Sequence, residues 1–236
     1  GAASAGAETV GRVEIVLPEK ANAIERFAAE ELGYHLKKAG ATDAPRRFVV
    51  GRAAAAELKV DLASFAAEEH LVKGVGNDVY LLGGDRLVGG ERGGPKVGSS
   101  SGRVACGTLY AVYDFLENEM GARWLWPGPT GEVIPKGRTV RLSRLDRGGV
   151  EPLAERLFYG FGDQGSNGFS CADAARAFAA AQMKFLVRHR LGRRDQVSGG
   201  HAFGDWWKKY GKEHPEYFNL LCDGTRRPNS SPGLVT

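Results

Sequence analysis

The chain has 236 residues, of which 42% are hydrophobic and 25% are charged, so it can bury a sizeable core without disulfide bonds or a structural metal ion to stabilise it. Its 32 Lys and Arg residues exceed its 28 Asp and Glu residues only slightly, and without a concentrated basic stripe this balance argues against nucleic-acid binding. Three cysteines without Cys-x-x-Cys spacing argue against a disulfide framework and a thiolate zinc site, no cofactor is expected, and no stretch approaches the ~18 apolar residues of a membrane span.

The N-terminal part of the sequence predicts a strand, a helix and a second strand. Residues 13–17 (VEIVL) form a β-type run that ends at Pro18. Asn22 and Glu25 have the spacing of a helix N-cap and its capping-box partner. Apolar residues at helical spacing then mark one face of a helix that ends at Gly40, namely Ile24, Phe27, Ala28, Leu32, Leu36 and Ala39. Residues 47–50 predict the second strand, whereas the Ala-rich stretch 53–67 is ambiguous.

The middle of the chain predicts a hairpin followed by a loop. Residues 70–73 and 78–82 indicate two strands joined through Gly74-Val75-Gly76-Asn77. The stretch 85–106 is so rich in glycine and serine that we expect a mobile surface loop. A phosphate-cradling loop is the sharper alternative, but the GxxxxGK[ST] motif is missing and the 74–76 glycines lie between strands. These missing motifs also argue against a nucleotide-binding α/β protein.

The element around which the chain is organised is a predicted helix at 107–120. Its apolar face is followed by Gly121, a residue that can take the left-handed conformation found at helix ends. We interpret Trp124 and Trp126 as core or interface packing, with direct ligand contact as the alternative. Extended segments at 132–134 and 139–142 complete an α+β domain, residues 8–145, with a mixed sheet and helices on one face.

The pattern changes after residues 146–149 (DRGG), which we interpret as a linker. A strand at 153–158, a long helix at 172–189 and short strands at 196–197 and 218–221 follow. This alternation is how a (β/α)8 TIM-type barrel begins. A complete barrel takes ~250 residues, and residues 151–236 supply only about a third of that length. We therefore expect an incomplete start of a barrel, and the chain is predicted to be an N-terminal fragment.

Several of these segments together resemble a known arrangement. The first series is Leu17-Pro-Glu, Phe27-Ala-Ala-Glu-Glu-Leu, Phe48-Val-Val-Gly, Asn77-Asp-Val-Tyr-Leu-Leu-Gly-Gly, Gly107-Thr-Leu-Tyr-Ala-Val-Tyr-Asp-Phe-Leu-Glu and Trp124-Leu-Trp-Pro-Gly. It is similar to the N-terminal α+β domain that precedes the catalytic barrel in bacterial α-glucuronidases and β-N-acetylhexosaminidases. The second series is Gly200-His-Ala-Phe, His214-Pro-Glu-Tyr-Phe-Asn-Leu and Asp223-Gly-Thr-Arg. It resembles the start of the domain of unknown function 4838, some members of which are endo-β-N-acetylglucosaminidases of glycoside hydrolase family 163.

The resemblance implies a secreted, periplasmic or cell-surface glycoside hydrolase. It also implies that the enzyme retains the anomeric configuration and acts on glycans that contain acetamido sugars. Ala3-Ser4-Ala5 would suit the small-residue end of a removed signal peptide. A hydrolase of uronic-acid glycans and a non-catalytic glycan-binding module are the alternatives, and the oligomeric state is left open. We expect the catalytic carboxylates beyond Thr236, because no acidic residues of 151–236 have the spacing of a catalytic pair, and we expect this chain alone to be inactive.

Three residues are candidates for substrate contact. Arg156 falls in the first predicted barrel strand, where a guanidinium can donate a fork of hydrogen bonds to sugar hydroxyls. His201 follows the second predicted strand and would lie at the barrel mouth, where βα loops build active sites. Trp206 could stack on a sugar, although we expect one of the adjacent Trp206 and Trp207 to pack inward. The alternatives are a strand-end charge for Arg156 and a structural loop histidine for His201.

Overall fold

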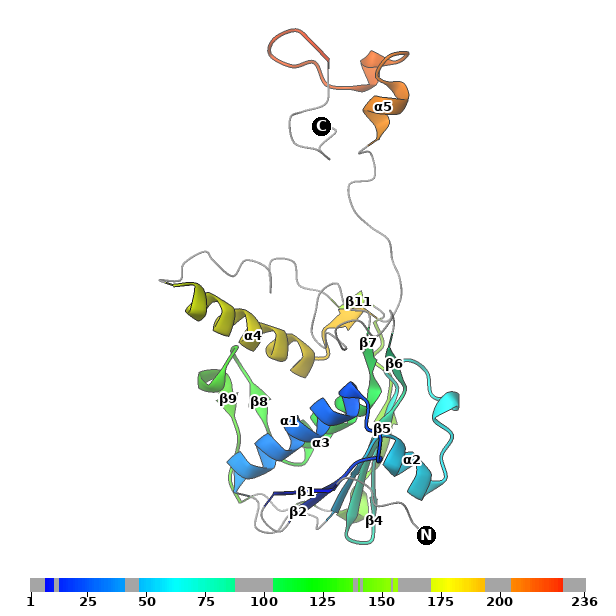
Figure 1. The fold of residues 1–236 in the computed structure, drawn as a ribbon, viewed down its shortest axis with the longest axis vertical. Coiled ribbons are helices and arrows are strands. Elements are labelled where there is room, and N and C mark those ends of the chain that lie inside the picture. Colours follow the sequence, from blue (N-terminus) through cyan, green and yellow to red (C-terminus); the bar gives the residue numbers. More distant parts are fainter. Residues whose placement is uncertain are drawn as a thin grey trace. The chain divides into compact units, whose positions relative to one another are not determined.

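The computed structural model describes residues 7–10, 13–40, 47–87, 104–137, 140, 142–153, 155–156, 171–193 and 205–226. By its internal contacts the chain divides into two compact units, Gly1–Asp195 and Gln196–Thr236. Figure 1 labels helices and strands of both units.

The first helix, α1 (Ala23–Ala39), begins at the predicted capping box. Asn22 Oδ1 accepts from the N–H of Glu25 at 2.9 Å, and Glu25 Oε2 accepts from the N–H of Asn22 at 2.8 Å. The helix ends at Gly40, whose φ of 60° is the left-handed conformation that glycine adopts without a steric penalty. The expected helix is confirmed at both ends.

Replacing Asn22 by alanine removes one half of this capping box. We expect the variant to lose about 1 kcal/mol of unfolding free energy, since the amide N–H of Glu25 loses its acceptor. Urea denaturation followed by circular dichroism measures the loss, and Asn22→Ser, which keeps an acceptor, should recover most of it. Equal losses for the two variants would contradict this role.

A six-stranded mixed sheet forms the centre of the first unit, in the order β1-β2-β3-β5-β4-β10. Its strands are β1 (Ala7–Val10), β2 (Val13–Val16), β3 (Arg47–Val50), β4 (His70–Val75), β5 (Asp78–Gly83) and β10 (Asp146–Gly149). The β2–β3 and β3–β5 pairs are parallel and the remaining pairs are antiparallel. The predicted hairpin is confirmed as β4–β5.

The DRGG segment interpreted as a linker is instead an edge strand, so that interpretation is wrong. In β10, Asp146 pairs with Lys73 and Gly149 pairs with His70 of β4. A Cβ atom at Gly148 would lie 2.3 Å from the carbonyl oxygen of His70. Glycine is therefore present because two backbones approach closely, and not because the segment is a flexible connection.

Helices cover both faces of the sheet. On one face α1 and α3 (Gly107–Asn118) build the main core with Ile15, Phe48, Val72 and Leu81. On the other face the short helix α2 (Arg52–Leu58) packs with Val16, Val49 and Leu82. Figure 1 shows α2 on the side of the strands opposite α1 and α3. The mixed α+β fold is thus observed, whereas the expectation that all helices share one face is wrong for α2.

The glycine-rich stretch expected to be a loop has strands at its two ends. Here β6 (Asp85–Leu87) pairs antiparallel with β7 (Val104–Cys106), while residues 88–103 lie outside the described part. The central helix α3 follows β7 directly, and Gly121 after it has the expected positive φ of 69°. A second hairpin then joins β8 (Arg123–Trp124) to β9 (Glu132–Val133). Short 3-10 helices lie at Leu62–Ser64, Pro129–Gly131 and Leu142–Arg144. Of the extended segment expected at 139–142 the structure describes residues 140 and 142, and Leu142 begins the last of these 3-10 helices.

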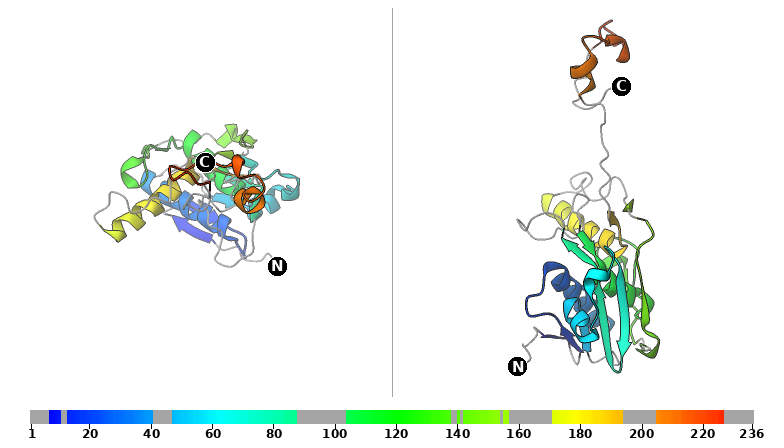
Figure 2. Two further views of the ribbon diagram at one scale, coloured as in Figure 1. Left: turned by 90° about the horizontal axis from the view of Figure 1, so that it is seen from above. Right: turned by 90° about the vertical axis from the view of Figure 1, so that its right-hand side faces the viewer.

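The segment after residue 150 belongs to the same first unit, beyond the predicted domain boundary. The predicted helix is confirmed as α4 (Ala172–Arg188), and Figure 2 shows it (yellow) next to α1 (blue). The strands β11 (Glu155–Arg156) and β12 (Gly192–Arg193) pair antiparallel. Successive barrel strands pair in parallel, so β11 and β12 are not neighbouring barrel strands, and the strand predicted at 196–197 lies outside the described residues.

The second unit contains α5 (Trp206–Tyr210) and a 3-10 helix at Pro215–Tyr217. The prediction of a strand at 218–221 is wrong. Phe218 ends the 3-10 helix, and the N–H of Leu221 donates to the carbonyl of Thr225 within a turn. The turn predicted at Asp223-Gly224 is present, with Gly224 at a φ of 76°. Among the helices that the structure describes in either unit, none is long and apolar enough to cross a membrane.

Candidate functional site

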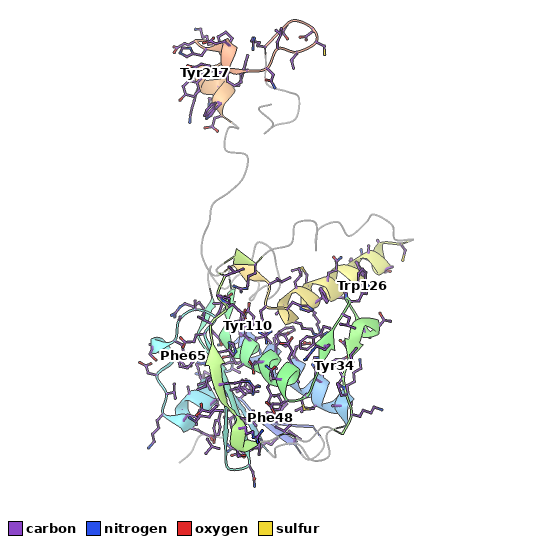
Figure 3. The ribbon with its side chains drawn as sticks, turned by 180° about the vertical axis from the view of Figure 1, so that it is seen from behind. Tyr34, Phe48, Phe65, Tyr110, Trp126 and Tyr217 are labelled. Atoms are coloured by element: carbon purple, nitrogen blue, oxygen red, sulfur yellow. The ribbon has the colours of Figure 1, made fainter. Side chains whose placement is uncertain are left out.

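A pocket of about 300 Å³ lies between α1, α4 and the turn that precedes β9. Acidic and basic side chains supply most of its walls, together with a tyrosine, a glycine, a proline and an alanine. The lining residues are Glu30, Glu31 and Tyr34 of α1, Gly128, Pro129 and Glu132, and Ala181, Lys184 and Arg188 of α4. Figure 3 shows Tyr34 on α1 and Trp126 beside α4.

Arg188 forms the base of this pocket and is clamped by two carboxylates. Its Nε donates to Glu31 Oε2 at 2.8 Å, and its Nη1 donates to Glu132 Oε1 at 2.6 Å. No side chain of the three is more than 6% exposed. Burial alone would lower the pKa of Arg188, but the hydrogen bonds to Glu31 and Glu132 outweigh it and raise that pKa. Arg188 is therefore a permanent buried cation.

Glu132 accepts hydrogen bonds from three different side chains. Besides Arg188, it accepts from Lys38 Nζ at 2.6 Å and from the Tyr34 hydroxyl at 2.6 Å. Burial raises its pKa, but these donors outweigh burial and lower the pKa to about 2. Glu132 therefore stays ionised at every physiological pH, and it cannot deliver a proton as a general acid does.

The wall behind the clamp is aromatic. Trp124 is buried and donates from Nε1 to His35 Nε2 at 3.0 Å. His35 Nδ1 lies 2.6 Å from the carbonyl oxygen of Glu31 and must donate there, so the ring is neutral with its proton on Nδ1. Burial lowers the pKa of His35, which agrees with the neutral form. The packing interpretation is confirmed for Trp124.

Trp126 behaves differently from Trp124. Its side chain is 58% exposed, and its ring tilts against Phe178 of α4 at a centroid distance of 6.5 Å. It lies in the loop between β8 and β9, which is closed by a hydrogen bond of 2.8 Å from the N–H of Leu125 to the carbonyl of Gly131. The turn thus holds a large indole at the surface next to α4.

Arg156, the first candidate for substrate contact, is engaged within the protein. Its Nη2 donates to both carboxylate oxygens of Glu68, at 3.0 and 2.9 Å, and its Nε donates to the carbonyl of Arg190 at 2.6 Å. The two side chains are 9% and 1% exposed. Substrate contact by Arg156 stays a prediction, and these buried contacts weigh against it.

The other two candidates lie in the second unit. His201 is outside the described residues, and its predicted role stays a prediction. Trp206 is on α5, 38% exposed, with its ring edge-on to Tyr210 at 5.7 Å. Its neighbour Trp207 packs against the buried Phe218 at 4.9 Å, which confirms that one of the two tryptophans packs inward.

None of the residues that line the pocket was predicted from the sequence to be a functional residue. Arg188 stands in an arginine-rich stretch, which is the one available signal, but nothing in the sequence pairs it with Glu31 or Glu132. In the part of the chain that the structure describes, no group of three or more His, Cys, Asp and Glu residues is arranged to hold a metal ion. No protein-family model, curated protein or solved structure matches this chain.

Proposed function

We propose that the chain is the N-terminal part of a retaining glycoside hydrolase of the endo-β-N-acetylglucosaminidase-like kind, which acts on acetamido-sugar glycans outside the cytoplasm. In this proposal residues 8–145 support a catalytic (β/α)8 barrel that starts within 151–236. The first series of segments that carry the resemblance supports it, because these segments form elements of one α+β unit, namely β2, α1, β3, β5, α3 and β8.

The observation that carries the supporting role is the docking of α4. Arg188 comes from the segment after residue 150, yet its guanidinium is buried between Glu31 and Glu132 of the α+β domain. A buried ion pair of this kind is costly to break, because either partner alone would be an uncompensated charge. The α+β domain therefore holds the following segment in one position, as a support domain must.

The pocket carboxylates are unsuited to hydrolysis themselves. A retaining glycosidase needs one carboxyl group that is protonated at working pH and one that is free to attack. The pKa of Glu132 is lowered, so Glu132 is not the protonated group, and Glu31 is engaged by Arg188 and is not free to attack. We therefore assign catalysis to residues outside this pocket.

Hydrolysis assays test the proposal. We expect the 236-residue chain to release no sugar from chitobiose-cored N-glycans or from glucuronoxylan fragments. We expect the gene product that includes the sequence following Thr236 to cleave the N-glycan core. Hydrolysis by the 236-residue chain alone would contradict the supporting role, and cleavage of glucuronoxylan only would replace the acetamido-sugar assignment by the uronic-acid one.

A non-catalytic glycan-binding module is the second candidate. The exposed Trp126 next to a polar pocket favours it, since an indole face and a few polar groups are typical of ligand sites. The same assay separates the two candidates, because a binding module retains glycans without releasing sugar.

A further inference from the structure

We propose that the pocket between α1, α4 and the 128–132 turn binds an uncharged sugar ring, with Trp126 as the stacking surface at its rim. The class of ligand rests on the proposed function, whereas the place and its charge preference rest on the geometry below. This would be a glycan contact separate from the catalytic residues, which the proposed function places outside this pocket.

The size and the walls of the pocket fit one sugar ring. Its volume of about 300 Å³ is at the lower end of the range for small-molecule sites. A Cβ atom built on Gly128 would lie 3.9 Å from the Cβ of Ala181, so the turn approaches α4 closely there. Trp126 contacts Phe178, which precedes Ala181 by about one helical turn. The exposed indole therefore lies beside the stretch of α4 that lines the pocket, and Figure 3 shows Trp126 next to this helix.

The polar groups of the pocket suit hydroxyls, which both donate and accept hydrogen bonds. Glu30 is exposed on α1 and can accept from a hydroxyl. Lys184 is 54% exposed and can donate to one, and its Nζ lies 3.6 Å from Glu31 Oε1. Arg188 already donates to Glu31 and Glu132, and Glu132 also accepts from Lys38 and Tyr34, so we assign Arg188 and Glu132 to the floor of the pocket.

The charges of the pocket disfavour an acidic sugar. Its lining holds three carboxylates, those of Glu30, Glu31 and Glu132, and two cations, Lys184 and Arg188, while Lys38 outside the lining already pairs with Glu132. Both cations already face a carboxylate, and a uronate would bring a further negative charge into partly buried surroundings. A neutral ring such as an N-acetylhexosamine or a xylose avoids this repulsion.

Calorimetric titration of the 236-residue chain tests the proposal with three disaccharides: diacetylchitobiose, xylobiose and a glucuronic-acid-bearing xylose. We expect the two neutral sugars to bind and the acidic one to bind at least about tenfold more weakly, the size of one charged interaction. Trp126→Ala should weaken neutral binding by about fivefold or more. Glu30→Gln should reduce the difference in binding affinity between the neutral sugars and the acidic sugar.

Two matched variants control for surface changes. Leu125→Ala removes the neighbouring exposed apolar side chain, and Leu125 does not line the pocket. Glu19→Gln removes an exposed carboxylate away from the pocket lining. Both should bind like the parent chain. Tighter binding of the acidic sugar, no binding of either neutral sugar, or no effect of Trp126→Ala would overturn the proposal. Because hydrolysis by the longer product is measured separately, a negative titration beside positive hydrolysis refutes this pocket alone.

Discussion

Replacing Arg188 by methionine is expected to lower the unfolding free energy of the first unit by about 3–5 kcal/mol, the cost of breaking a buried ion pair by removing one partner. The substitution keeps most of the side-chain volume but leaves the carboxylates of Glu31 and Glu132, which are 3% and 4% exposed, without their shared guanidinium. Urea denaturation, followed by tryptophan fluorescence and circular dichroism, measures the loss.

Two controls separate the buried clamp from a general loss of charge. Arg176 lies on the exposed part of α4, with its side chain 72% exposed and paired with Asp173, which is 87% exposed. Arg176→Met should therefore cost less than about 1 kcal/mol, as surface ion pairs do. Adding Glu31→Gln and Glu132→Gln to Arg188→Met should recover part of the loss, since the uncompensated charges are gone. A loss for Arg188→Met no larger than that for Arg176→Met would refute the clamp.

The local elements of the fold were predictable because their causes lie close together in the sequence. The capping box of α1 needs residues three apart, and the β4–β5 hairpin needs only the few residues between its strands. The helix α3 was indicated by its apolar periodicity and by Gly121. Each of these signals lies within one element or in the turn next to it, so it can be recognised without knowing the tertiary contacts.

The remaining features depend on partners far away in the chain. Gly148 is needed because β10 lies against His70, a relation that the sequence does not reveal, so the segment resembled a linker. Arg188 meets Glu31 across 157 residues and Glu132 across 56. Arg156 likewise meets Glu68 across 88 residues. Sequence reasoning identifies such charges but cannot tell an arginine that binds a ligand from one that neutralises a buried carboxylate.

Asp85 is expected to make the unfolding free energy of the first unit depend on pH. This partly buried residue starts β6, and its Oδ1 accepts from the N–H of Thr108 at 2.9 Å, at the N-terminus of α3. Burial raises the pKa of Asp85 to about 7, although the hydrogen bonds from Thr108 act against the shift. An aspartate in an unfolded chain has a pKa of about 3.9. Between these two values the native state keeps a proton that the unfolded state releases.

The unfolding free energy should therefore fall as pH rises from about 4 to about 7, by at most about 4 kcal/mol from this residue. Asp85→Asn retains a side-chain oxygen for the Thr108 N–H but removes the ionisation. We expect the variant to be more stable than the parent chain at pH 8 and to show a flatter pH dependence between pH 4 and 7, in urea denaturation at several pH values. Asp61, whose Oδ1 accepts from the N–H of Ala63 at an exposed 3-10 helix start, provides the matched control. Asp61→Asn should leave the parent's slope unchanged, and an equally steep slope in Asp85→Asn would show that Asp85 is ionised in the native protein throughout this pH range.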